Sequence, residues 1–167
     1  TLYGVALTGE VVGGFFSYDL ASQRPARPYP ETLEGEMADW AAIKEAGHVP
    51  IVLGAADGDA VHLYGILLDA MAEPGWSDAL VYGRSGATFA TPEAVAAAAM
   101  LVEMGDRGFF SDDYAAIGHD EAVRRYLAGE GEFLWTGSWD ALAIGVGEPD
   151  ALFTELMPAT PDGQTRA

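Results

Sequence analysis

Trp139 is the side chain in this sequence best suited by type and position to contact a ligand. It ends the run Gly129–Trp139, which predicts a helix stop, a buried strand and a Gly-Ser turn that presents the ring. A strand-to-helix corner is a common place for a ligand surface, and an aromatic face packs well against C–H groups. Position alone favours a core role for Trp139 at the start of a helix. Trp135, on the strand itself, is predicted to be core.

Glu10, Asp57, Asp59 and His62 are further polar residues that lie near predicted turns and helix starts. Glu10 comes just before a double glycine, Asp57 and Asp59 lie in the loop after a buried strand, and His62 follows one helical turn later. A carboxylate accepts hydrogen bonds from two hydroxyl groups, which suits a ligand rich in hydroxyls. Three alternatives stay open: an exposed turn acid for Glu10, helix capping for one of the two aspartates, and a solvent-facing His62.

The spacing of acidic and histidine residues does not predict a metal site. Asp57-Gly-Asp59 begins like a calcium loop, but Leu68 stands where the closing Glu of such a loop is required. His48, His62 and His119 are scattered and form no His-Glu-x-x-His motif. The chain has no cysteine, so thiolate sites and disulfides are excluded. We expect neither a metal nor another cofactor.

Catalytic motifs are equally absent from the sequence. Gly83–Ala87 misses the Gly-x-Ser-x-Gly nucleophile motif by one position, and no phosphate-binding glycine loop follows a predicted strand. A glycosidase needs two carboxylates that flank the bond it cleaves. Many acids are present and nothing in their spacing selects a pair, so a glycan-active hydrolase using, for instance, Glu10 and Asp57 is an open alternative.

Alternating strand and helix patterns must position these side chains. Strands are predicted over Leu2–Leu7, Val11–Tyr18, His48–Leu53, Glu132–Thr136 and Phe153–Met157, and a loop over Asp19–Pro30. Helices are predicted between Thr32 and Gly47, after Asp57-Gly-Asp59, between Thr91 and Gly105, and over Asp120–Ala128. This alternation predicts an α/β domain with more helix than strand. We expect one domain over residues 1–157 and a loosely held tail over residues 158–167.

Composition narrows the class of protein. A chain of 167 residues, half of them apolar, suits one domain with a sizeable core. The net charge of −18, from 26 acidic and 8 basic residues, repels phosphate groups and argues against nucleic-acid binding and docking on anionic lipid. No apolar run reaches membrane-spanning length, and no leader precedes the first strand. Because Leu2 already begins a strand, we expect an excised or processed piece of a longer protein.

Segments spread along the chain carry a resemblance to a known family. Leu2–Leu7 is similar to a Y-G-V-P strand, Glu10–Leu20 to a stretch ending Y-Y-N-K-D-L, and Pro30–Glu34 to P-K-T-W-D-E-L. Ala46–Gly54 matches A-G-x-x-P-I-A-L-G, and Gly129–Trp139 is similar to F-x-x-G-K-A-A-M-x-x-x-G-x-W. In this order they resemble the extracellular solute-binding proteins of bacterial ABC importers, most of all the sugar-binding, maltodextrin-type family.

This resemblance implies the second lobe of a periplasmic-binding-protein-like fold, helix-rich with a central mixed sheet. It implies non-catalytic binding of a carbohydrate or similar polar solute for ABC-type import. Trp139 would then pack on sugar, and Glu10, Asp57, Asp59 and His62 would line the cleft. The implied partners are a small-molecule carbohydrate, an ABC permease and the opposing lobe that this chain lacks. The implied location is extracytoplasmic, either periplasmic or on the cell surface as a lipoprotein.

Departures from the family pattern concern the pocket rim and the length of the chain. Ser17 replaces an Asn, Leu33 a Trp, and Glu132 a small apolar residue. One lobe supplies half of a binding cleft, so we expect this chain to bind sugar weakly or undetectably by itself. A further alternative is an isolated structural or interaction lobe that binds no ligand.

Overall fold

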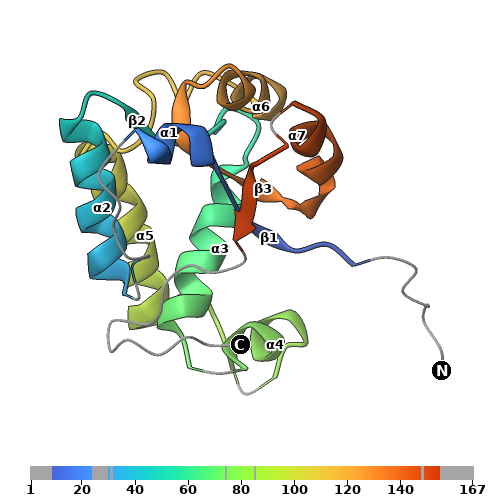
Figure 1. Ribbon diagram of the computed structural model, residues 1–167. Helices are drawn as coiled ribbons and strands as arrows, with labels where there is room; N and C mark the ends of the chain where they lie inside the picture. Colours follow the sequence, from blue (N-terminus) through green and yellow to red (C-terminus); the bar gives the residue numbers. More distant parts are fainter. Residues whose placement is uncertain are drawn as a thin grey trace.

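The structure, a computed structural model, describes residues 9–23, 30, 32–73, 75–84, 86–147 and 149–154. Within them the chain forms three layers, a central sheet with helices on both faces (Figure 1). The α/β class predicted from the sequence is confirmed. The predicted strand Leu2–Leu7, the boundary at residue 157 and the tail over residues 158–167 lie outside the described residues.

A four-stranded mixed sheet forms the middle layer. Its strands are β1 (Val12–Phe16), β2 (Val49–Val52), β3 (Gly131–Gly137) and β4 (Leu152–Thr154), in the spatial order β2-β3-β1-β4. β2 runs parallel to β3, whereas β1 is antiparallel to both β3 and β4. β3 is central and buried along its whole length. The sheet is therefore mixed, as the resemblance implies.

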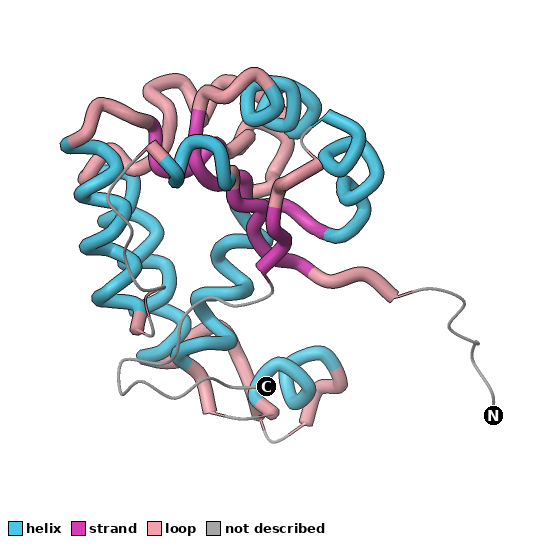
Figure 2. The backbone as a smooth tube through the Cα atoms, viewed as in Figure 1, coloured by secondary structure: helices cyan, strands magenta, loops and turns pink. Residues whose placement is uncertain are grey.

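Helices cover both faces of this sheet (Figure 1, Figure 2). The helices are α1 (Tyr18–Ser22), α2 (Leu33–Glu45), α3 (Ala60–Met71), α4 (Trp76–Val81), α5 (Pro92–Asp106), α6 (His119–Leu127), α7 (Ala141–Gly147) and the short 3-10 helix η1 (Ser138–Asp140). α2, α3 and α5 pack on one face, and α6 and α7 pack on the other. Within the described part of the chain, no helix is long and apolar enough to cross a membrane.

Alternating side chains of β2 and β3 enter two separate hydrophobic cores. Ile51, Phe133 and Trp135 point to the face covered by α2, α3 and α5. Val52 and Leu134 point to the opposite face, under α6 and α7. Because successive side chains of a strand alternate between faces, burial on both faces requires the continuous apolar runs that predicted these strands.

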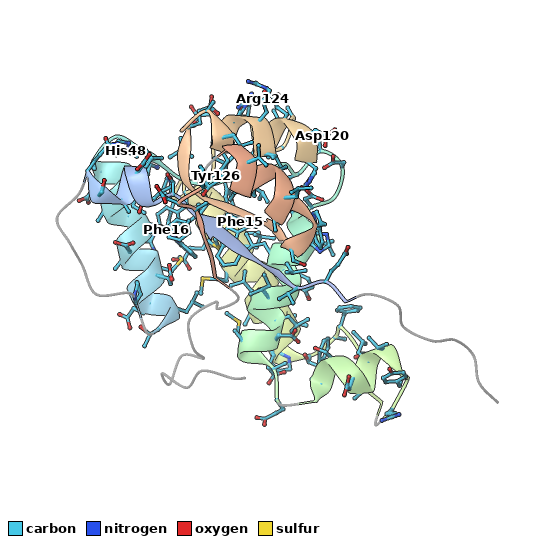
Figure 3. The ribbon with its side chains drawn as sticks, turned by 45° about the vertical axis from the view of Figure 1, so that its right-hand side comes forward. Phe15, Phe16, His48, Asp120, Arg124 and Tyr126 are labelled. Carbon is cyan, nitrogen blue, oxygen red and sulfur yellow. The ribbon has the colours of Figure 1, made fainter. Side chains whose placement is uncertain are left out.

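β1 shows the same alternation. Phe16 packs on Phe133, with ring centroids 5.0 Å apart, whereas Phe15 belongs to the core under α6. Figure 3 shows Tyr126 on the inner side of α6, toward this core, and Arg124 on its outer side. The amphipathic helix α6 therefore closes the second face of the sheet.

Two threonines begin long helices as the sequence predicts. The hydroxyl of Thr32 accepts a hydrogen bond from the N–H of Gly35 at 3.0 Å, and that of Thr91 accepts one from the N–H of Ala94 at 3.2 Å. An N-cap of this kind satisfies one of the N–H groups that the first helical turn leaves unpaired. The predicted starts of α2 and α5 are thereby confirmed.

Three local predictions need correction. The loop predicted over Asp19–Pro30 is wrong at its start, because the Ser17 hydroxyl accepts a hydrogen bond from the N–H of Leu20 at 3.5 Å and begins α1. α4 was not predicted, since a short helix with no buried side chain leaves no apolar pattern. Asp59 occupies the N-cap position of α3, but its side chain makes no capping bond.

Candidate functional site

The topology of the sheet brings the predicted ligand residues to one edge. β2 and β3 are parallel, so the loops that follow them leave the sheet on the same side. β1 is antiparallel to β3 and pairs Val12 with Gly137, so the residues before β1 meet the end of β3. Glu10, the Asp57–Asp59 loop and Trp139 therefore share the carboxyl edge of β2 and β3. Open α/β sheets place their ligands at this edge as a rule.

Trp139 lies at the surface of this edge, with 37% of its area exposed. Its ring packs over Gly137, where an added Cβ would come within 2.1 Å of Cζ3. It also contacts His62 near the start of α3, with ring centroids 5.3 Å apart and an interplanar angle of 53°. Trp135, by contrast, is 5% exposed and belongs to the core, as predicted. Two neighbours thus hold the ring of Trp139 while part of it stays accessible.

Glu10 is joined to the turn of Trp139 through its neighbour in sequence. The N–H of Val11 donates to Oγ of Ser138 at 3.1 Å, and the N–H of Ser138 donates to the Val11 carbonyl at 2.8 Å. This reciprocal pair continues the β1–β3 ladder past Gly137. It fixes the chain entering β1 against the turn that carries Trp139, and the side chain of Glu10 is exposed there.

His119, the first residue of α6, joins two of the loops at this edge. Its Nδ1 lies 2.6 Å from Oδ2 of Asp59, and its Nε2 lies 3.1 Å from Oδ2 of Asp140. Asp140 also accepts a hydrogen bond from the Thr136 hydroxyl at 2.5 Å. Sequence analysis treated His119 as a scattered histidine and did not select Asp140. No local motif predicts this bridge, because its members are 21 and 60 positions apart in sequence.

The two carboxylates control the charge of His119. Burial removes water from the ring and by itself lowers the pKa of His119. The hydrogen bonds and charges of Asp59 and Asp140 outweigh burial and raise this pKa above its ordinary value of 6.5. Each ring nitrogen faces a carboxylate oxygen, and only the doubly protonated imidazolium donates to both. The geometry and the pKa therefore both favour a cationic His119.

Asp57 caps a helix, but not the helix predicted. Its Oδ2 accepts a hydrogen bond from the backbone N–H of His119 at 2.8 Å, which satisfies the amino end of α6. Gly118 leaves room for this carboxylate, because a Cβ added at Gly118 would come within 2.6 Å of Oδ2 of Asp57. Sequence analysis predicted that the Asp57-Gly-Asp59 segment would cap α3, which directly follows. The contact with α6 arises from tertiary structure and leaves no local pattern.

This edge, which we call the tryptophan edge, combines an accessible aromatic ring with carboxylates. All five residues predicted from the sequence lie on it: Glu10, Asp57, Asp59, His62 and Trp139. Such a surface packs a ring against C–H groups and accepts hydrogen bonds from hydroxyls. Among the residues that the structure describes, no group of three or more His, Asp or Glu side chains could hold a metal ion.

Comparisons with known proteins agree with this architecture. No family model and no curated protein matches the sequence. Among solved structures, the chain is similar to a chitin oligosaccharide binding protein, with a TM-score of 0.82 and 21% identity over 95% of this chain. It is similar to a family 1 extracellular solute-binding protein from Bifidobacterium longum subsp. infantis, with a TM-score of 0.72 and 17% identity over 93% of this chain. It is also similar to the SBP RafE in complex with raffinose, with a TM-score of 0.71 and 18% identity over 90% of this chain.

The chain has the fold of one lobe of a periplasmic-binding-protein-like solute receptor. It spans 40% of the chitin oligosaccharide binding protein and of RafE, and 41% of the Bifidobacterium protein. The fold class predicted from the sequence is therefore confirmed. These neighbours are sugar-binding and solute-binding proteins.

Proposed function

We propose that this chain forms one wall of a carbohydrate-binding cleft in a receptor of an ABC-type importer, of the maltodextrin type. Trp139 packs on the sugar, while Glu10, His62 and the Asp57–Asp59 loop surround it. A second lobe, outside this chain, closes over the ligand by a hinge motion, as the fold class does in general. The receptor works outside the cytoplasm and delivers its ligand to an ABC permease.

The observation that carries this proposal is the pose of Trp139. The ring is packed from two sides, by Gly137 and by His62, yet 37% of the residue is exposed. A ring already fixed in place loses little conformational freedom when a ligand binds. Sugars present C–H faces that such a ring covers and hydroxyls that nearby carboxylates accept. The tryptophan edge supplies both kinds of contact.

The structural neighbours support carbohydrate as the ligand class. One neighbour is a chitin oligosaccharide binding protein, and another holds raffinose. Their identities of 21% and 18% are too low to transfer a particular sugar to this chain. The proposal therefore names a carbohydrate and leaves the sugar to experiment.

A glycan-active hydrolase is the second candidate, and the geometry favours it less. Of the two carboxylates that it would use, Asp57 already accepts the N–H at the amino end of α6, and Glu10 is exposed. His119 faces carboxylates with both ring nitrogens, which leaves neither nitrogen in position to act on a substrate proton. Because Asp57 and His119 are already held by these hydrogen bonds, they suit a fixed binding surface better than proton transfer to or from a substrate.

One wall of a cleft is expected to bind weakly. Association costs at least ~4 kcal/mol of lost freedom, and a stacked aromatic contributes roughly 1 kcal/mol beyond the area that it buries. A closed cleft removes most of a ligand's surface from water, whereas a single wall leaves many hydroxyls solvated. We therefore expect the affinity of this chain alone to be far weaker than micromolar.

Isothermal titration calorimetry of the 167-residue chain with mono- and oligosaccharides tests the proposal, alongside an assay for released sugar. We expect weak binding, no released sugar, and loss of binding in Trp139→Ala. Tyr82→Ala is the matched control, because it removes another aromatic ring that is 65% exposed. Sugar release would favour the hydrolase, and the absence of any binding would favour a structural lobe. Micromolar binding that is abolished by Trp139→Ala would support the tryptophan edge as the binding site, but it would refute the expectation that one wall of the cleft binds weakly.

A further inference from the structure

We propose that His119 is a positioning residue of the tryptophan edge: its imidazolium joins Asp59 to Asp140, holds the turn that carries Trp139, and makes saccharide binding weaken as pH rises. The proposal deepens the function given above and rests on it. His119 is not expected to touch the ligand. It acts through Asp140, the residue that follows Trp139.

The bridge joins two segments that follow different strands of the sheet. Asp59 belongs to the loop after β2, and Asp140 belongs to η1 after β3. The ring of His119 lies between them, with 2.6 Å from Nδ1 to Asp59 and 3.1 Å from Nε2 to Asp140. The side chain of His119 is 24% exposed, so water competes only partly for these contacts. A single cation therefore ties both loops to the start of α6.

The turn that carries Trp139 depends on such contacts because it is short. η1 consists of Ser138, Trp139 and Asp140 alone. Its first residue is held by Val11 and its last by His119 and Thr136. Trp139 stands between these two anchors. A displacement of Asp140 is therefore expected to move Trp139, because the two residues are adjacent in η1.

Deprotonation changes the bridge in a defined direction. Neutral imidazole has one N–H and donates to one carboxylate only, so the second nitrogen then faces an oxygen with no proton between them. Asp59 and Asp140 would repel each other without the cation between them. Two more carboxylates add to the negative charge around the His119 ring. Asp57 accepts the backbone N–H of His119, and Asp120 is the next residue in α6. Loss of the proton thus loosens η1.

The sign of the pH dependence follows from the raised pKa of His119. The bridge is complete below the ordinary pKa of 6.5 and is lost as pH rises through the higher pKa of the folded protein. The ring of His62 contacts the Trp139 ring directly. It must be separated from His119 by experiment. The third histidine, His48, directly precedes β2 and lies on the opposite side of the molecule from Asp120 in Figure 3, so it serves as a control.

Proton NMR of the three histidine rings and of the Trp139 indole, followed from below pH 6.5 to well above it, tests the coupling without ligand. We expect the Trp139 indole signal to move with the midpoint of His119, in the wild type, in His48→Gln and in His62→Gln. His119→Gln should abolish that movement. If His119→Gln does not fold, Asp140→Asn should lower the midpoint of His119 and shift the Trp139 movement with it. An indole signal that follows His62, or that stays still while His119 titrates, would overturn the proposal.

Saccharide titrations at the two ends of this pH range supply the functional readout. We expect binding to weaken by about two- to tenfold at high pH, the range for loss of one aromatic contact. His119→Gln should bind at both pH values as weakly as the wild type binds at high pH, so that the pH dependence disappears with the histidine. Affinity that is equal at both pH values in the wild type would overturn the proposal. If no saccharide binds at any pH, the proposed function fails, and the indole titration still decides whether His119 positions Trp139.

Discussion

Gly137 lies directly beneath the ring of Trp139, and the absence of a side chain there is what admits the ring. A Cβ at Gly137 would stand 2.1, 2.3 and 2.4 Å from three ring atoms of Trp139. Contacts this short are not tolerated between carbon atoms, so one partner must move. Trp139 is partly exposed and has room to swing outward, whereas Gly137 is fixed in the central strand β3.

We therefore predict that Gly137→Ala displaces the ring of Trp139 and leaves the fold intact. Saccharide binding should fall as far as in Trp139→Ala, while the midpoint of denaturant unfolding changes little. Gly145→Ala is the matched control, because an added Cβ there meets no atom within 4 Å. It lies in α7 and should be neutral or more stable by about 0.5–1 kcal/mol. Wild-type binding by Gly137→Ala would show that the ring pose does not matter.

Asp57 is predicted to stabilise α6 from a distant part of the chain. Asp57→Ala removes the acceptor for the His119 N–H and should lower the free energy of unfolding by about 0.5–2 kcal/mol, as for other N-caps. Asp57→Asn keeps an acceptor oxygen and should lose much less. Urea denaturation of both variants measures the difference. Equal losses in Ala and Asn variants would mean that the charge, and not the cap, stabilises α6.

The carboxyl group of Glu121 is predicted to stay ionised in acid. Hydrogen bonds from Arg124 at 2.5 and 2.8 Å, and then from Arg125 at 2.8 Å, lower the pKa of Glu121 from 4.5 to about 2. Because the folded-state pKa is depressed, its contribution to stability is present above pH 4.5 and is lost as pH falls toward about 2. Carbon-13 NMR of the Glu121 carboxyl should show this titration.

Arg124→Gln is the variant that tests this assignment, since Arg124 is the largest cause of the shift. It should move the pKa of Glu121 back toward 4.5. Arg107→Gln removes an arginine from a single, separate ion pair with Glu103 and should leave the titration of Glu121 unchanged. If the pKa of Glu121 were the same in Arg124→Gln as in the wild type, the hydrogen bonds from Arg124 to Glu121 would not form in solution.

Elements with complete local signals were predictable from the sequence. Thr91, Pro92 and Glu93 supply an N-cap, a rigid first position and an acid in the first turn, and α5 begins there. β3 was predictable because its apolar run is buried on both faces. α4 was not, since its side chains are not buried and no periodic pattern marks it.

Only part of the candidate site could be found in the same way. Trp139 stands out because its turn signal and its family resemblance coincide. The bridge of His119 to Asp59 and Asp140 leaves no trace in local sequence, because the sheet topology alone brings these residues together. The capping role of Asp57 was predicted in kind but assigned to the wrong helix, since the sequence neighbour α3 is not its partner in space.

Nitrogen-15 NMR of the indole N–H groups during a saccharide titration tests the central claim most directly. The chain has four tryptophans, and Trp40, which is fully buried, is an internal control. We predict that the Trp139 indole and the backbone amides of the Asp57–Asp59 loop shift with added saccharide, while Trp40 does not. The account would be contradicted if the Trp139 indole signal did not shift and the chemical-shift changes lay instead around the pocket of about 450 Å³ beside His48.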